Sequence, residues 1–99
     1  MALEQPTDDP TFWYGTNIQF VMTGRSPSGK TIVWLVQARR GGDHLGYVRW
    51  MSRWRKYSFY PEPNCVFEEV CLGDIAAFLT RKTAEHKGIK ITLGEYIGG

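Results

Sequence analysis

Cysteine is scarce in this chain of 99 residues, which contains only Cys65 and Cys71. The two could pair with each other, but in a cytosolic chain we expect reduced thiols. The two histidines, His44 and His86, complete the set of soft metal ligands, and the spacing of the four residues resembles no zinc finger. We therefore expect no metal ion and no other cofactor.

Long hydrophobic runs are also absent. No apolar stretch reaches the ~18–20 residues of a membrane-spanning helix. Residues 1–10 lack the basic and apolar regions of a secretory signal. We therefore expect a cytoplasmic protein with no membrane partner, whose 42% hydrophobic content is enough for the small core of one domain.

Acidic residues are nearly missing from the middle of the chain. Residues 25–56 contain Asp43 as their one acidic side chain against eight basic ones, whereas residues 57–80 contain four acidic side chains and no basic one. Such asymmetry indicates an anionic partner for the basic part. Solvated strand faces and hairpin tips are the structural alternative.

Alternation of apolar and polar residues predicts strands in the first two thirds of the chain. The expected strands are residues 17–23, 31–37, 45–50 and 57–60. Short turns rich in Gly, Ser, Pro or Asp separate them, which predicts an antiparallel meander. Residues 1–15 are expected to be a flexible leader, in which Phe12, Trp13 and Tyr14 either fold back onto the domain or form an exposed anchor.

The period of the apolar residues changes from about Glu68. Cys71, Ile75, Phe78 and Leu79 then recur at helical spacing and predict one amphipathic helix that ends at Gly88. The expected fold class is therefore α+β, with an antiparallel sheet of about four strands followed by one helix (ββββα) that lies across one sheet face. A short final strand at residues 89–93 would complete a single domain of residues 16–93, followed by a flexible tail at 94–99.

Residues 24–31 read GRSPSGKT and match the phosphate-binding motif GxxxxGK[ST] in full. In that motif a helix must begin at the Lys-Thr pair, so that its N-terminus points at the phosphates. Here a strand-like run, Ile32-Val-Trp-Leu-Val, follows instead. The segment is therefore predicted to be a hairpin loop, in which Gly24 and Gly29 adopt unusual dihedral angles, and not a nucleotide site.

Basic and aromatic residues alternate through residues 47–57. Single-stranded nucleic acid is bound by this combination, because cations follow the phosphates while aromatic rings stack on bases. The candidate nucleic-acid-binding residues are Arg39, Arg40, Arg49, Arg53, Trp54, Arg55 and Lys56, with Trp54 as the stacking platform. The structural alternative places Trp50, Tyr57 and Phe59 in the core, with arginines covering tryptophan rings.

No catalytic set can be assembled from the sequence, and we expect the protein not to be an enzyme. Nucleophilic catalysis would need Cys65 or a serine beside one of the two histidines, and nothing places them together. We expect helix capping as the role of the carboxylates in a loop and at the helix start: Glu62, Glu68, Glu69 and Asp74.

The pattern LGxxxW at residues 45–50, followed by WRxYxFxPxPNxxFxxxCLxxIxxFL at residues 54–79, resembles a set of short phage and prophage proteins. The resemblance covers about residues 14–86 and implies no functional residue in this chain. It implies a mobile-element setting, in which such proteins act on host factors or on nucleic acid. The ββββα order also resembles, by topology only, the single-strand DNA binders of the transcriptional-coactivator and Whirly type.

Two functions follow as hypotheses. The first is a small non-enzymatic module that binds nucleic acid, preferably single-stranded, through a basic and aromatic sheet surface. The alternative is a protein–protein interaction module that modulates a host protein, anchored by an exposed aromatic residue such as Trp13 or Trp54. Short sheets with exposed edges often pair across a two-fold axis, so a homodimer is compatible with both.

Overall fold

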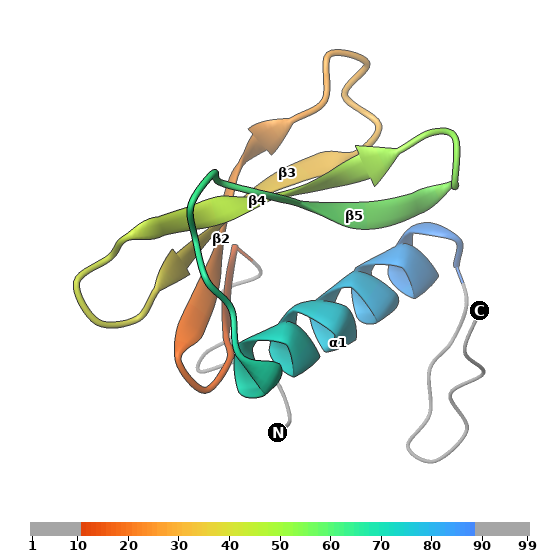
Figure 1. Ribbon diagram of the computed structural model, residues 1–99. Helices are drawn as coiled ribbons and strands as arrows, with labels where there is room; N and C mark the ends of the chain where they lie inside the picture. The colour runs from red at the N-terminus through yellow and green to blue at the C-terminus, as the bar shows by residue number, and fades with distance from the viewer. Residues whose placement is uncertain (1–10, 89–99) are drawn as a thin grey trace.

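The computed structural model describes residues 11–88 and shows a five-stranded antiparallel sheet followed by one helix (Figure 1). Its elements are β1 (Phe12–Tyr14), β2 (Ile18–Arg25), β3 (Ile32–Ala38), β4 (His44–Met51), β5 (Lys56–Pro61) and α1 (Glu69–His86). The strand order is β1-β2-β3-β4-β5, the expected meander. The predicted α+β class is confirmed, with one strand more than expected. Three predicted parts lie outside the described residues: the leader up to residue 10, the final strand at 89–93 and the tail at 94–99.

The additional strand, β1, lies within the stretch that the sequence assigned to a flexible leader. It pairs with β2, and Trp13 stands opposite Phe20. The Trp13 ring contacts Phe78 of α1, with 6.3 Å between the ring centroids. Of the two possibilities for this segment, folding back is therefore correct, because its central ring gains apolar contact with the core. The prediction of Trp13 as an exposed anchor is wrong, and the sheet begins before the predicted domain boundary at residue 16.

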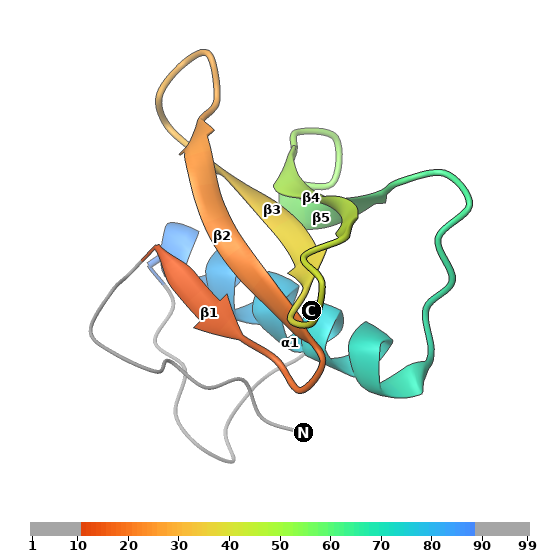
Figure 2. The ribbon, with the colours of Figure 1, turned by 90° about the vertical axis from the view of Figure 1, so that its left-hand side faces the viewer.

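Helix α1 lies across one face of the sheet (Figures 1 and 2). Its apolar stripe packs against the core there. The stripe is the predicted one: Cys71, Ile75, Phe78 and Leu79. Phe78 is its centre, because its ring stacks on Phe20 at 4.0 Å with an interplanar angle of 7° and meets Trp34 edge-on at 5.1 Å. All three rings are buried. The edge-on contact with Trp34 is a geometry that aromatic pairs prefer. The core is therefore built around one helical phenylalanine.

Both helix ends agree with the sequence. Glu68 is the N-cap, and its Oε1 accepts a hydrogen bond of 2.7 Å from the Cys71 N–H, which lowers the pKa of the Glu68 carboxyl. At the other end Gly88 has φ +73, the left-handed conformation that glycine adopts readily, and its N–H donates to the Glu85 carbonyl oxygen at 3.1 Å. The predicted stop at Gly88 is confirmed.

The segment that matches the phosphate-binding motif is a hairpin loop between β2 and β3. Strand β3 begins at Ile32, where a nucleotide site would need a helix. The Gly29 N–H donates to the Ser26 carbonyl oxygen at 2.8 Å, and Gly29 has φ +77. Only Gly29 has the unusual dihedral that was predicted for both glycines. Gly24 does not have a positive φ and lies where the register of the β2–β3 pair shifts, so it accommodates a bulge.

Within residues 11–88, no helix is both long and apolar enough to cross a membrane.

Candidate nucleic-acid interface

The sheet has two unlike faces, because successive side chains of a strand point to opposite sides. One face packs against α1 (Figure 2). On the other, the strand register aligns one residue from each strand in a row across the sheet: Phe12, Val21, Leu35, Tyr47 and Tyr60. We call this side the open face, since no helix of the described chain covers it (Figure 1). The row is apolar and aromatic from one edge strand to the other.

The β4–β5 side of the open face combines stacked aromatic and basic side chains. Tyr47 and Tyr60 are direct partners across the two strands, and Tyr47 is 36% exposed. The guanidinium of Arg49 lies over the Tyr60 ring, 4.5 Å from its centroid. An arginine over a ring can still direct N–H groups toward an anion. Aromatic rings and a cation therefore lie next to each other on this side of the face.

The β1 side of the open face repeats this combination. The guanidinium of Arg39 lies 4.6 Å from the centroid of the Tyr14 ring. Its Nη1 also donates to the Gly15 carbonyl oxygen at 3.0 Å, which ties the β3–β4 turn to the β1–β2 turn. Between β2 and β3, the Gln19 Nε2 donates to the Gln37 Oε1 at 2.8 Å. This side of the face is thus ordered by polar contacts, and Arg39 retains further donors.

Charge is divided between the two layers of the molecule. The sheet half, residues 11–61, has eight Lys or Arg side chains and one acidic side chain, Asp43. None of the five strands contains Asp or Glu. Residues 62–88 have five carboxylates and three Lys or Arg side chains. Within the described residues there is one ion pair, Lys82 with Glu85 at 3.1 Å, and it is on the helix. The basic side chains of the sheet therefore have no carboxylate partner among these residues.

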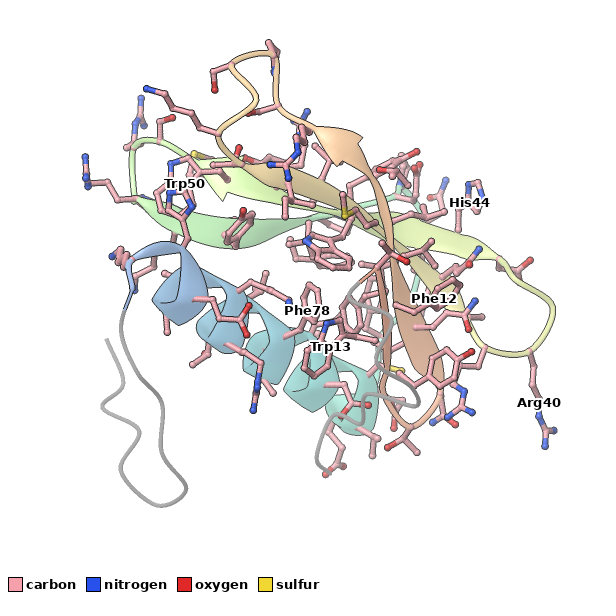
Figure 3. All side chains as sticks on the ribbon, turned by 180° about the vertical axis from the view of Figure 1, so that it is seen from behind. Phe12, Trp13, Arg40, His44, Trp50 and Phe78 are labelled. Carbon is pink, nitrogen blue, oxygen red and sulfur yellow. The ribbon has the colours of Figure 1, made fainter. Side chains whose placement is uncertain are left out.

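The candidate binding residues do not form one compact patch. Arg39 and Arg40 follow β3, whereas Arg53, Trp54, Arg55 and Lys56 lie at the β4–β5 turn. Strand β4 separates the two groups by its eight residues, or about 25 Å at the rise of an extended chain. Figure 3 shows this separation, with Arg40 at one end of the sheet and Trp50 at the other. Of the seven candidates, only Arg49 lies on the open face between the ends.

The structural alternative is confirmed for three aromatic residues of the basic segment. Tyr57 is buried, and Trp50 and Phe59 pack partly buried against the core. Trp50 meets Tyr57 edge-on at 5.3 Å and contacts the His86 ring of α1 at 4.5 Å. The arginines that cover rings on the sheet cover tyrosines, as described above, and not the tryptophans of this segment.

Trp54 is the exception in this segment, because its side chain is 63% exposed. It is in the four-residue loop 52–55, which joins Met51 to its partner Lys56. Arg55 has φ 55, a left-handed conformation that commonly closes such a loop. The expectation that Trp54 is available for stacking is therefore compatible with its place in the fold.

The open-face aromatics Phe12, Tyr47 and Tyr60 were not among the candidates. Tyr47 and Tyr60 lie in predicted strands, and alternation puts them on the side opposite Val48 and Phe59. That signal was present in the sequence. Phe12 gave none, because β1 has only three residues, too few to show a period.

The acidic helix has one carboxylate in a different role from the predicted one. Glu68 caps the helix as expected, but Asp74 is only 1% exposed and its Oδ2 accepts a hydrogen bond of 2.7 Å from the Thr16 N–H. Gly15 packs against it so closely that a Cβ there would lie 2.5 Å from the same oxygen. Asp74 therefore binds the β1–β2 turn to the helix and does not cap α1.

The remaining reactive groups are a lysine ammonium group on α1 and the two cysteine thiols. Lys82 places its Nζ 4.7 Å from the Trp13 ring centroid and 5.0 Å from that of Trp34, and burial lowers the pKa of its ammonium group. Cys65 and Cys71 are free thiols, and burial is the largest cause that raises the pKa of Cys71. No three His, Cys, Asp or Glu side chains within residues 11–88 are grouped so that they could hold a metal ion.

Comparison with known proteins identifies a relative of this chain. No family model matches the sequence, and no solved structure matches it. The resemblance to single-strand DNA binders of the Whirly type therefore stays a hypothesis. An uncharacterised 9.3 kDa protein of Acholeplasma phage L2 is 31% identical over 70 residues, which are 71% of this chain and 88% of the phage protein. The chain therefore belongs to the same family as this protein of Acholeplasma phage L2.

Proposed function

We propose that this chain is a small non-enzymatic module that binds single-stranded nucleic acid across the open face of its sheet. The observation that carries the proposal is the row of aromatic and apolar residues that the register aligns, with Arg49 over Tyr60 of the row and Arg39 over the neighbouring Tyr14. Unpaired bases have apolar faces that stack on such rings, and their phosphates are met by the arginines. A duplex hides its base faces, so it fits this surface less well.

The distribution of charge supports the same ligand. A polyanion is attracted to the sheet half and not to the acidic helix layer. The two basic ends of the sheet, with Arg49 between them, form a path along β4 for a phosphate backbone, and this path crosses the aromatic row at Tyr47. The path is about 25 Å long, which matches a short site at the low end of the ~4–16 nucleotides that sheet-based modules cover.

Fluorescence anisotropy with labelled oligonucleotides at ~50 mM salt tests the proposal, because phosphate contacts are strongest at low salt. We expect single strands to bind more tightly than a blunt duplex. Tyr47→Ala is expected to weaken single-strand binding by about 5–150-fold, since one base–aromatic contact is worth roughly 1–3 kcal/mol. Tyr47→Phe keeps the ring and is expected to bind like the original protein.

Leu72→Ala is the matched control, because Leu72 is 50% exposed on the helix layer, away from the open face. It is expected to leave the affinity unchanged. If the protein without substitutions binds neither single-stranded nor duplex nucleic acid, the proposal is overturned and the protein-binding alternative remains. Equal losses in Tyr47→Ala and Leu72→Ala would also count against the open face as the site.

A further inference from the structure

The β4–β5 turn presents a tryptophan to solvent, and binding on the open face alone does not use it. Trp54 is 63% exposed and has no ring contact within the described chain. Arg53, Arg55 and Lys56 beside it are exposed as well, and no carboxylate of the described residues pairs with them. We call residues 52–56 the hairpin tip. A large apolar ring among unpaired cations is the surface that an aromatic, anionic partner would cover.

The backbone of the hairpin tip is ordered by its own hydrogen bonds. The Arg55 N–H donates to the Met51 carbonyl oxygen at 2.8 Å and to the Ser52 carbonyl oxygen at 3.2 Å. The left-handed conformation of Arg55 completes the closed loop. Trp54 is therefore presented by a turn that its own hydrogen bonds stabilise, which reduces the entropy lost when a ligand binds.

The position of the hairpin tip determines which part of a bound nucleic acid would contact it. It lies at one end of the open face, so a single strand that runs along β4 past Arg49 leaves the sheet beside Trp54. Exposed cations flank the tryptophan in the chain: Arg53 precedes it, and Arg55 and Lys56 follow it. An unpaired base brings one phosphate backbone to the ring. The last base pair of a duplex brings two, one on each side of a flat apolar surface.

We infer that Trp54 stacks on the terminal base pair of a duplex, so that the preferred ligand is a junction between single-stranded and duplex nucleic acid. This inference rests on the proposed function, because the open face must hold the single-stranded part. The hairpin tip then supplies the contact that a single strand alone does not make. Arg53 and Arg55 contact the two backbones at the end of the duplex.

Anisotropy with three labelled DNA probes tests the inference: an unpaired eight-nucleotide strand, a blunt duplex, and that duplex with the same eight nucleotides as an overhang. The original protein is expected to bind the overhang probe about tenfold more tightly than the unpaired strand. Trp54→Ala is expected to reduce the affinity for the overhang probe to that for the unpaired strand. The affinity for the unpaired strand itself is expected to change less than twofold. Trp54→Phe retains a ring and is expected to recover part of the difference.

The outcomes separate the inference from the function on which it rests. Equal affinity of the original protein for the overhang probe and the unpaired strand would overturn the junction preference and leave open-face binding intact. Equal losses on both probes in Trp54→Ala would show that Trp54 stacks on an unpaired base, which also overturns the inference. Binding to none of the probes would overturn the proposed function itself. Since Trp54 is largely exposed, its variants are expected to fold, which circular dichroism verifies.

Discussion

Gly46 shows how one residue permits the close approach of two strands beneath the open face. It is buried in β4 with φ +154, a backbone conformation that residues with a side chain rarely adopt. A Cβ at this position would collide with the carbonyl oxygen of Tyr60 and with the ring of Phe59. The collision with backbone cannot be relieved by a rotamer change. Gly46 therefore sets the position of Tyr60, one of the proposed stacking residues.

Gly46→Ala is expected to destabilise the protein by about 3 kcal/mol or more, because it adds overpacking to a strained φ. Urea unfolding followed by circular dichroism measures the change in the free energy of unfolding. Gly24→Ala is the control, since Gly24 does not have a positive φ and no atom lies within 4 Å of its added Cβ. A similar loss in both variants would contradict the role of close packing at Gly46.

Strand β1 is too short to be stable by its own ladder and is held by contacts from other elements. Trp13 packs on Phe78 of α1. The turn that follows β1 is bound from two sides: the Thr16 N–H donates to Asp74 of the helix, and the Gly15 carbonyl oxygen accepts from Arg39. Helix and β3–β4 turn together place Phe12 at the end of the open-face row. The edge of the proposed site thus depends on a helical carboxylate that no ligand would touch.

Asp74→Ala is expected to lower the free energy of unfolding by about 1–3 kcal/mol, because the part-buried Thr16 N–H loses its acceptor. Amide hydrogen exchange should also accelerate in β1 more than in β3. Asp74→Asn keeps an acceptor oxygen and is expected to lie closer to the original protein. Were Asn as damaging as Ala, the carboxylate charge and not the hydrogen bond would be what stabilises the turn.

The molecule as a whole is a basic sheet layer on a helix layer with excess negative charge. Eight basic side chains accompany one carboxylate in residues 11–61, and five carboxylates accompany three basic side chains in residues 62–88. The sheet layer is therefore expected to attract a large polyanion more strongly than the helix layer does. Association with nucleic acid is expected to use the sheet side alone and to weaken steeply as salt is added.

The dependence of the association constant on salt concentration measures how many phosphates the protein neutralises. For single strands each phosphate contact contributes about 0.7 to the slope of log K against log salt. Arg49→Gln is expected to reduce the slope by about this amount. Lys87→Gln, which removes an exposed charge at the end of α1, should leave it unchanged. Identical slopes for the two variants would contradict binding on the open face.

Much of the fold follows from local patterns in the sequence. The helical spacing of Ile75 and Phe78 predicts which side of α1 is buried, and the strand-like run after Thr31 predicts a hairpin where the motif alone suggests a nucleotide site. The capping role of Glu68 and the stop at Gly88 are equally local. These features depend on residues a few positions apart, so the sequence is sufficient to predict them.

The candidate site could be predicted only in part, because its parts come from distant strands. The sequence by itself determined that basic and aromatic residues are concentrated in the strands and turns of 25–60 and that acidic ones follow. Only the tertiary structure decided that Arg39 and Arg53 lie at opposite ends of the sheet and that Phe12 joins Tyr47 and Tyr60 in one row. The physical reason is register: a shift of one residue exchanges the two faces of a strand, and long-range packing on α1 selects between them.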